Sequence, residues 1–294
     1  MSASNATPAV HGGILYVVAT PIGNLGDLSP RAQQVLGAVT VIAAEDTRHT
    51  RQLLQSFGIA TPLTSLHEHN ETHKSAHLVE QLARGDSVAL VSDAGTPLIS
   101  DPGFDLIAAA RRQGIQIVAV PGPCAAIAAL SIAGLPTDRF VFEGFLPAKT
   151  GARRAHLEQV GSEQRTLVFY EAPHRLAEVL ADMAAVLGAQ RTATVAREIT
   201  KRFETAYNGT LAELAEQAQR DADMSRGEIV IVVGGAAAAA PDAVALNSEQ
   251  VLRALLVDLP PSQAAKIAAR ITGEKRAALY ERAVQIGGKA CAAE

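Results

Sequence analysis

The stretch SVALVSDAGTPLISDPG, residues 87–103, joins a short apolar run to a loop rich in turn-forming residues. The uncharged run at its start predicts a buried strand, because short β-branched segments favour enclosed positions in a sheet. The loop that follows, residues 92–103, holds two Pro, two Gly and two Asp. Glycine lets a backbone approach a ligand closely, and proline holds a loop in one shape. We therefore expect a binding loop at the end of a buried strand.

Short apolar runs alternate with helical patterns on both sides of this stretch. Helix-like apolar spacing covers residues 30–39 and 70–84, and a third helical pattern covers 101–114, where Asp101 is the expected N-cap. An alternation of strands and helices predicts a parallel sheet with helices on its faces, and thus an α/β fold. The expected strands are 14–20, 39–45, 61–66, 87–93 and 115–121.

A second α/β pattern follows, with a different sheet. The apolar runs 192–198 and 204–210 are separated by only a short turn, which predicts antiparallel neighbours in a mixed sheet. The other expected strands of this sheet are 139–147, 166–172 and 227–235. The predicted organisation is a disordered arm over 1–13, an N-terminal α/β domain over 14–123, a second α/β domain over 124–235, a linker over 236–247 and a small C-terminal helical module over 248–294.

Composition narrows the class of protein. The formal net charge of -4 provides no overall attraction to nucleic acid, so a polyanion would have to be held by local basic clusters. Cys124 and Cys291 form no spaced framework, which favours a reducing, cytoplasmic setting. No long uncharged apolar window is present in the sequence, so a membrane span is not indicated.

Four Pro-rich, Gly-rich or charged loops leave the expected strands of the first sheet, over residues 19–27, 44–50, 92–103 and 120–126. In an open parallel sheet, ligands bind beyond the carboxyl ends of the strands, where the strand order reverses. None of the loops has the glycine pattern of a dinucleotide site or a phosphate-binding loop. The loops therefore indicate a ligand of another kind at this edge.

A set of motifs, taken in order, resembles the ribosomal RNA small subunit methyltransferase I family of the tetrapyrrole methylase-like class. The motifs are LYVVATPIGNLGDLSPRA, AEDTRHTRQLL, SLHEHNE, LVSDAGTPLISDPG, PGPCAAIAALSIAGLP, LVFYEAPHRL, AREITKRFE and GEIVIVV, and they span roughly residues 14–235. The resemblance implies two α/β domains of tetrapyrrole methylase type, with S-adenosylmethionine (SAM) in the cleft between them, and a homodimer. It further implies methyl transfer to the ribose 2′-hydroxyl of a cytidine in the decoding region of 16S rRNA, within the small ribosomal subunit.

The first loop departs from the wider class. Its relatives generally carry a glycine-rich loop, whereas Ala19 and Pro21 stand here at two of those positions. This difference favours a large anionic acceptor over a porphyrinoid. Two alternatives remain open: a methyltransferase of the same fold that acts on a tetrapyrrole or another small acceptor, and a non-catalytic ribosome-assembly factor.

The resemblance also implies the residues that hold the cofactor. They lie in the first and third loops, after the fifth expected strand, and in the second domain. Many of these contacts would be made by the backbone, so side-chain identity is free to vary. For Cys124 a small buried apolar group is the simpler interpretation. The expected cofactor-binding residues are Pro21, Ile22, Asp93, Gly95, Thr96, Ile99, Ser100, Cys124, Ala125, Tyr170, Glu228 and Ile229.

The expected catalytic residues are Arg197, Glu198 and Lys201, in the motif AREITKRFE. A ribose hydroxyl is a very weak acid, so a base or a cation beside it would help its proton to leave. The same charges also suit a solvated turn with weak surface ion pairs. Placement and water exclusion are the other tasks of the protein, because the sulfonium already carries a good leaving group.

The expected substrate-binding residues are Asp46, Arg48, His49, His174 and Arg175. Arg and His can contact RNA phosphate, and Asp46 can orient a ribose hydroxyl or cap a helix that begins at the next residue. No metal site is expected, because the four histidines between residues 67 and 77 have no accompanying cysteine and no H-E-x-x-H pattern.

Overall fold

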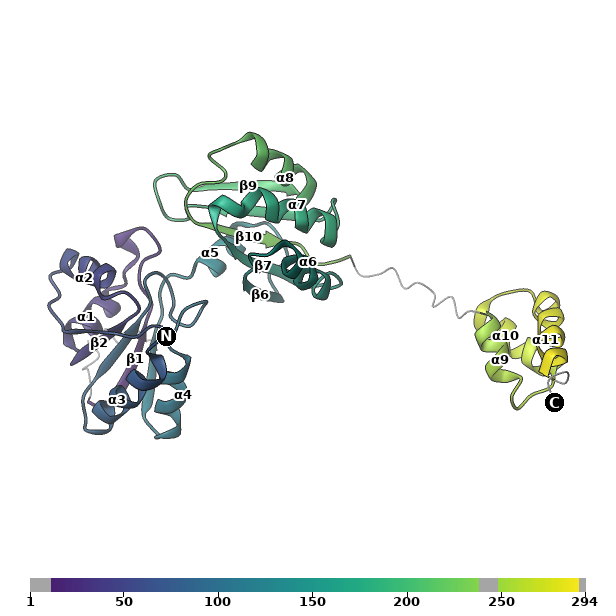
Figure 1. The fold of residues 1–294 in the computed structure, drawn as a ribbon, viewed down its shortest axis with the longest axis horizontal. Helices are drawn as coiled ribbons and strands as arrows, with labels where there is room; N and C mark the ends of the chain where they lie inside the picture. The colour runs from purple at the N-terminus through teal and green to yellow at the C-terminus, as the bar shows by residue number, and fades with distance from the viewer. Residues whose placement is uncertain (1–11, 238–247, 291–294) are drawn as a thin grey trace, which may run out of the picture. The chain divides into compact units, whose positions relative to one another are not determined.

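The computed structural model describes residues 12–237 and 248–290, and it forms two compact units over 1–236 and 237–294 (Figure 1). The first unit contains two five-stranded sheets, and the second is helical. Nearly all of the predicted arm and linker lies outside the described residues.

The first sheet is wholly parallel, with the strand order β3-β2-β4-β1-β5. All five strands predicted for this sheet are present, so the expected α/β architecture is confirmed. Their bounds are β1 Ile14–Val18, β2 Val41–Ala44, β3 Leu63–Ser65, β4 Val88–Val91 and β5 Gln116–Val120.

Side chains alternate between the two faces of this sheet, as the period of a strand requires. Ile14 and Tyr16 pack on one face against α1 and α2, whereas Leu15 packs on the other face against α3 and α4. Both faces are therefore covered by helices, which explains why the strands are almost entirely apolar. The helices are α1 Pro30–Ala38, α2 Thr47–Ser56, α3 Glu71–Ala83 and α4 Phe104–Arg112.

The helix starts differ in how they are capped. Asp46 caps α2 by accepting a hydrogen bond from the backbone N–H of Arg48, at 2.8 Å, so that prediction is confirmed. The prediction that Asp101 caps α4 is wrong. The N-cap position belongs to Gly103, whose φ is +128°, and the Oε1 atom of Glu71 accepts the N–H groups of Gly103 and Asp105 at 3.0 and 2.7 Å.

The second sheet is mixed, with the order β6-β7-β10-β8-β9. β6 and β7 are parallel, whereas β10 is antiparallel to both β7 and β8, and β8 is antiparallel to β9. The predicted mixed sheet is confirmed. Its strands are β6 Phe140–Phe145, β7 Thr166–Glu171, β8 Thr192–Arg197, β9 Thr205–Thr210 and β10 Ile229–Val233.

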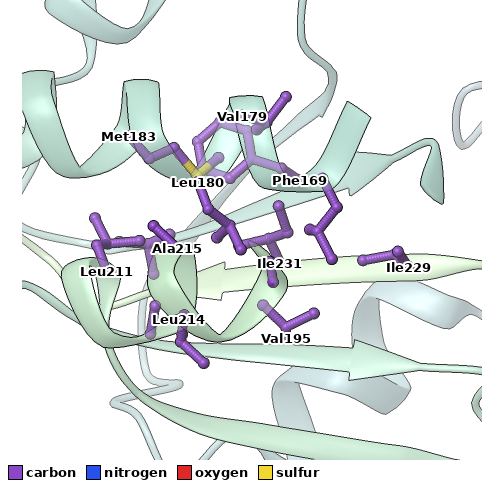
Figure 2. Packing of buried hydrophobic residues seen from close by; sticks show 14 of the residues in the cluster. Phe169, Val179, Leu180, Met183, Val195, Leu211, Leu214, Ala215, Ile229 and Ile231 are labelled. Atoms are coloured by element: carbon purple, nitrogen blue, oxygen red, sulfur yellow. The ribbon is translucent and has the colours of Figure 1, made fainter. Parts of the chain in front are cut away.

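The larger core of this domain lies on one face of the second sheet, beneath α6, α7 and α8. Figure 2 shows Phe169 and Ile231 of the sheet meeting Leu180 of α7 and Leu214 of α8. On the opposite face, a smaller buried cluster joins α5 to Val168, Val230 and Val232 of the sheet. The helices are α5 Ala125–Ile132, α6 Thr150–Gln159, α7 Leu176–Leu187 and α8 Leu211–Arg220.

The second unit consists of three helices around a small core in its described part. Leu252, Ala264, Ala268 and Leu279 are fully buried there. The small side chains allow close helix approach, and α10 ends at Gly273, which takes a left-handed conformation. The helices predicted for this module are present as α9 Ser248–Leu255, α10 Pro261–Thr272 and α11 Arg276–Ala290.

Candidate active site

The first and third loops leave neighbouring strands at the carboxyl edge of the parallel sheet. β1 and β4 are adjacent, but the chain passes from β1 to β2 on one side and from β4 to β5 on the other. Such a reversal of strand order creates a crevice for a ligand. A pair of backbone hydrogen bonds between Thr20 and Gly95, at 2.9 and 3.0 Å, ties the two loops together. These hydrogen bonds therefore fix the position of the first and third loops relative to each other at the base of the crevice.

A cavity of about 340 Å³ lies over these loops and reaches the second sheet. Its walls come from the third loop, from the start of α5, and from the ends of β7 and β10. That volume lies within the range of small-molecule sites. The lining residues are Ile22, Ala94, Gly95, Thr96, Ile99, Ser100, Asp101, Ala125, Phe145, Tyr170, Glu171, Ala172, Pro173, Ile199, Gly227, Glu228, Ile229 and Val230.

Most of the residues expected to bind the cofactor line this cavity, but three lie elsewhere. Pro21 and Asp93 line a neighbouring cavity of about 300 Å³, which they share with His49. Cys124 is a partly buried free thiol directly before α5. The residues that do line the main cavity are Ile22, Gly95, Thr96, Ile99, Ser100, Ala125, Tyr170, Glu228 and Ile229.

The sequence interpretation overlooked several lining residues, notably Asp101, Phe145 and Glu171. Asp101 had been assigned to a helix cap. Phe145 lies at the end of β6, where its exposed ring meets Tyr170 edge to face at a centroid distance of 5.6 Å. Glu171 directly follows Tyr170 in the motif YEAPHR, which is the signal that could have identified it.

The third loop is held in a strained shape. Leu98 and Ser100 both have positive φ values, of +73° and +71°, which are uncommon for residues other than glycine. The hydroxyl of Thr96 donates to the carbonyl of Pro123 at 3.0 Å. A Cβ built on Gly144 of β6 would lie 3.3 Å from the Ser100 hydroxyl. The loop is thus packed between the first domain and the second, and strained backbone of this kind concentrates at functional sites.

Tyr170 connects the second sheet to α5. Its hydroxyl oxygen accepts a hydrogen bond from the backbone N–H of Ala126, at 3.2 Å. Burial raises the pKa of this phenol above its ordinary value, so the hydroxyl stays neutral at physiological pH. Tyr170 therefore shapes the cavity wall and does not act as a base.

Three acidic side chains face one another beside the third loop. The backbone N–H of Asp46 donates to the Oδ1 atom of Asp93 at 2.9 Å. Burial, together with the carboxylates of Glu45 and Asp93, raises the pKa of Asp101 to about 6, even though a hydrogen bond from Ser92 opposes the shift. Burial and then Asp93 raise the pKa of Glu45 as well. Burial and the neighbouring carboxylates thus favour the protonated forms of Asp101 and Glu45.

The residues expected to be catalytic lie at the end of β8 and in the turn after it, and the guanidinium of Arg197 donates to two backbone carbonyls. The Nε atom of Arg197 donates to the carbonyl of Arg226 at 2.8 Å, and Nη1 donates to the carbonyl of Phe203 at 3.2 Å. Arg197 is buried and does not line either cavity described above. Its contacts hold the turn after β8 against Arg226, in the segment that leads into β10.

Glu198 and Lys201 form a linked pair in the same turn. Glu198 has a φ of +53°, and its Oε1 atom accepts hydrogen bonds from Lys201 Nζ at 2.9 Å and from the backbone N–H of Glu228 at 3.0 Å. Lys201 Nζ also lies 3.2 Å from Glu228 Oε1. Burial opposes the charge of Lys201, but the two carboxylates outweigh it and raise the lysine pKa.

The same turn also contacts the first domain. A Cβ built on Gly23 would lie 2.4 Å from the Cγ atom of Lys201, so the lysine side chain covers that glycine closely. The hydroxyl of Thr200 donates to Asp27 of the short 3-10 helix η1, Leu25–Asp27, at 2.5 Å. The turn after β8 thus spans the two domains beside the cavity.

The residues expected to bind substrate do not form one cluster. Arg48 is 84% exposed and forms an ion pair with Asp46, whose pKa it holds well below the usual range. His49 lines the neighbouring cavity, and His174 is exposed on the 3-10 helix η2, Pro173–Arg175. Arg175 donates from Nη2 to the carbonyls of Leu146 and Pro147, at 2.9 and 3.1 Å.

Two negative findings concern the described residues alone. Over 12–237 and 248–290, no group of three or more His, Cys, Asp or Glu side chains is arranged to hold a metal ion. Within the same part of the chain, every helix is too short or too polar to cross a membrane.

The matched families agree with the two compact units. Residues 14–215 match the family described as Tetrapyrrole (Corrin/Porphyrin) Methylases, and residues 242–287 match the RsmI C-terminal HTH domain. The Ribosomal RNA small subunit methyltransferase I of Xylella fastidiosa (strain Temecula1) is 59% identical over 91% of this chain and 98% of that protein. The chain belongs to the ribosomal RNA small subunit methyltransferase I family.

Other family members are nearly as similar. The proteins of the same name from Pseudomonas aeruginosa and from Escherichia coli O157:H7 are 54% and 50% identical, each over 94% of this chain, and the matches cover 99% and 96% of those proteins. The similarity therefore runs through both α/β domains and the helical unit of this ribosomal RNA small subunit methyltransferase I family member.

Solved structures share the two-domain fold at low identity. The methyltransferase CobJ is 22% identical with a TM-score of 0.55, over 77% of this chain and 95% of that chain. Diphthine synthase is 15% identical with a TM-score of 0.55, over 75% and 90%. A Thermus thermophilus uroporphyrin-III C-methyl transferase, complexed with S-adenyl homocysteine, is 17% identical with a TM-score of 0.52, over 75% and 96%. At these low identities, the similarity shows that this chain shares its fold with these proteins, and it shows nothing about a shared activity.

Proposed function

We propose that this protein transfers the methyl group of SAM to the ribose 2′-hydroxyl of a cytidine in the decoding region of 16S rRNA. The observation that carries the proposal is the cavity of about 340 Å³ at the strand-order reversal of a chain that belongs to the ribosomal RNA small subunit methyltransferase I family. The names of the relatives support the substrate, and the motif resemblance supports the cytidine and its 2′-hydroxyl.

The cavity suits SAM in size and in chemistry. Ile22, Ile99 and Ile229 provide an apolar lining for an adenosine ring, and Ser100 and Asp101 add polar side chains to the same cavity. Glu171 lines the same cavity, and its Oε2 atom is buried without a hydrogen-bond partner among the described residues. An unpaired buried carboxylate oxygen is costly, so a ligand that donates a hydrogen bond there would stabilise the site.

When bound, SAM supplies an electrophilic methyl group on a cationic sulfur. The protein then has to orient the acceptor oxygen in line with the methyl carbon and to exclude water. Lys201 and Glu198 support this geometry by joining the turn after β8 to Gly23 in the first loop. Arg197 is a positioning residue in this proposal, since its guanidinium holds the backbone of the turn.

The remaining expected cofactor residues, Pro21, Asp93 and Cys124, belong to the rim of the proposed site. Pro21 and Asp93 share a second cavity with His49, and in this proposal that cavity receives the acceptor nucleotide. Arg48 and His174 are exposed and would contact the RNA backbone. We propose that a single flexible nucleotide enters this edge while the rest of the RNA is held by shape and charge.

The proposal can be tested by methyl transfer from radiolabelled SAM to small ribosomal subunits purified from a strain that lacks the enzyme. We expect one methyl group per subunit, at the 2′-oxygen of one cytidine. Subunits from the parent strain are the control, since their site is already modified and should accept none. A lack of incorporation into the unmodified subunits would contradict the proposed function.

A tetrapyrrole acceptor is the alternative that the shared fold suggests, but it has less support. The uroporphyrin-III-C-methyltransferase of Thermus thermophilus and a cobalt precorrin-4 methyltransferase are 21% and 15% identical to this chain, whereas a relative named for ribosomal RNA is 59% identical. The match of residues 242–287 to an HTH domain also favours a nucleic acid. Incubation with SAM and uroporphyrinogen should therefore yield no methylated product.

We further propose that the protein works in the cytoplasm as a homodimer. Phe104 and Phe203 are large apolar side chains with exposed fractions of 72% and 60%, and in this proposal the partner subunit covers them. Sedimentation of the purified protein should give twice the mass of the chain. A purely monomeric protein at micromolar concentration would contradict the homodimer.

A further inference from the structure

Three acidic side chains line the main cavity, and two of them are already engaged. Glu171 Oε1 accepts the backbone N–H of Ala172 at 2.7 Å and lies 3.4 Å from Arg175 Nε. Glu228 is paired with Lys201 at 3.2 Å. Burial and then the carboxylates of Glu45 and Asp93 raise the pKa of the third acid, Asp101, and a hydrogen bond from Ser92 lowers it. Of the three cavity acids, Asp101 is the one that forms no ion pair with another described residue.

The position of Asp101 also suits contact with an acceptor. It is half-buried, it directly follows Ser100 with its left-handed backbone, and it faces Tyr170 of β7 across the cavity. Tyr170 remains neutral, and its hydroxyl interacts with the thiol of Cys124. The acids Glu45 and Asp93 stand behind Asp101, on the loops after β2 and β4. The unpaired Oε2 atom of Glu171 independently marks the same cavity as a place for a ligand.

We propose that the carboxylate of Asp101, which lines the cavity together with Tyr170, is the catalytic base that accepts the proton of the acceptor hydroxyl. This inference rests on the proposed function, because it assigns a role within the same site. Asp101 takes the role of base that the sequence predicts for the turn after β8. In that turn Glu198 already accepts two hydrogen bonds, and Lys201 is held by two carboxylates.

The proton and electron balance of the step is simple. The O–H bond of the acceptor breaks and its proton moves to an Oδ atom of Asp101, while the oxygen forms a bond to the methyl carbon. The bond between that carbon and sulfur breaks, and its electron pair stays on sulfur, so the products are a 2′-O-methyl group and neutral S-adenosylhomocysteine. Asp101 then releases the proton to solvent. No further oxidant, reductant or metal ion is needed.

The acidic neighbours make this role effective at neutral pH. A carboxylate with an ordinary pKa is a poor base, whereas the burial and the two carboxylates that raise the pKa of Asp101 to about 6 make it a better proton acceptor that is still ionised at pH 7. A base with a pKa near the working pH contributes about 10²- to 10⁴-fold to a rate. We therefore expect the rate of transfer to fall as the pH drops below about 6.

The test compares Asp101→Asn, Asp101→Glu and Glu45→Gln with the wild type, and uses Glu80→Gln as the matched control because Glu80 is exposed on α3. Single-turnover transfer from SAM to unmodified small subunits is measured from pH 5 to pH 9, and SAM affinity is measured by calorimetry. Asp101→Asn should lower the rate at least about 100-fold while SAM affinity changes less than about 3-fold. Asp101→Glu should restore part of the rate.

A second readout needs no activity. The ¹³C carboxyl resonance that disappears in Asp101→Asn should titrate near pH 6 in the wild type and at lower pH in Glu45→Gln. The acid limb of the rate profile should move in the same direction, and Glu80→Gln should change neither. Retention of the wild-type rate in Asp101→Asn, a parallel loss of SAM affinity, or an ordinary titration midpoint would each overturn the inference. A wild-type enzyme that transfers no methyl group would instead contradict the proposed function.

Discussion

The side chain of Lys201 covers the Cα atom of Gly23 so closely that a Cβ there would lie 2.4 Å from the lysine Cγ. These residues belong to different domains, and they meet beside the cavity. Lys201 cannot simply move away, because its Nζ atom is held by Glu198 and Glu228. The first loop and the turn after β8 can therefore pack together only because residue 23 is a glycine, which leaves room for the Lys201 side chain.

Gly23→Ala should disrupt this fit. The φ of +143° at position 23 disfavours any residue with a Cβ, and the methyl group would displace Lys201 from its two carboxylates. We expect SAM affinity to fall at least about 10-fold, with a loss of stability of about 1 to 3 kcal/mol. Calorimetry with SAM and thermal unfolding measure the two effects.

Gly188→Ala is the control for backbone strain alone. Gly188 has a φ of +112°, and no atom lies within 4 Å of a Cβ built there. This variant should lose stability to a similar extent without a loss of SAM affinity. Equal SAM affinity in the two variants would show that the contact between Gly23 and Lys201 does not support the site.

Tyr170→Phe should loosen the start of α5. The substitution leaves the backbone N–H of Ala126 buried without its acceptor, which costs about 1 to 3 kcal/mol. Urea unfolding measures this loss, and calorimetry should show weaker SAM binding because Ala125 lines the cavity. Tyr280→Phe, at an exposed position of α11, should change stability by less than about 0.5 kcal/mol. An unchanged unfolding midpoint in Tyr170→Phe would contradict the role of the hydroxyl.

Asp101→Asn should stabilise the folded protein at pH 7. Because the folded-state pKa of Asp101 is raised from 3.8 to about 6, ionisation of this group opposes folding, and the cost grows between these two pH values and stays constant above them. After allowance for solvent screening of a half-exposed group, we expect a gain of about 1 to 2 kcal/mol at pH 7. The gain should vanish below about pH 4 in urea unfolding curves. A gain that persists at low pH would have a cause other than ionisation.

Asp182→Ala should strongly destabilise the second domain. Asp182 accepts a hydrogen bond from the Nε atom of Arg153 at 2.6 Å, and the Arg153 side chain is only 1% exposed. Removal of the carboxylate leaves a buried guanidinium without its main partner, which costs about 3 to 5 kcal/mol. Arg154→Ala removes the more exposed partner of Asp182 and should cost about 0 to 1 kcal/mol in the same unfolding assay. Similar costs for the two variants would contradict this ranking.

The secondary structure was predictable because it depends on neighbours in sequence. Buried apolar runs such as Val88–Val91 and Ile229–Val233 have few alternatives to a central strand, and the short turn between β8 and β9 leaves only an antiparallel pairing. The motif resemblance also led to much of the cavity lining, including Gly95 and Tyr170. These features depend on patterns within about ten residues of chain.

The rest of the site depends on partners that are remote in sequence. Aspartate is a residue type that commonly caps helices, so the sequence predicts this role for Asp101. In the structure, however, Glu71 accepts the N–H groups at the start of α4. The charged residues of the turn after β8 suggest catalysis. The carbonyl groups that accept hydrogen bonds from Arg197 could be identified only from the folded structure. Cavity lining by Asp101 and the contact of Lys201 with Gly23 follow from the folded arrangement, and no local pattern predicts them.

The capping of α4 by Glu71 has a consequence for protein engineering. The side chain that terminates the third loop belongs to α3, so residues 92–103 do not carry all the information for their own conformation. A transplant of this loop into another parallel sheet would lose its last anchor unless the glutamate were transplanted with it. The smallest portable element is therefore a helix and a loop together, joined by one carboxylate across thirty-two residues of chain.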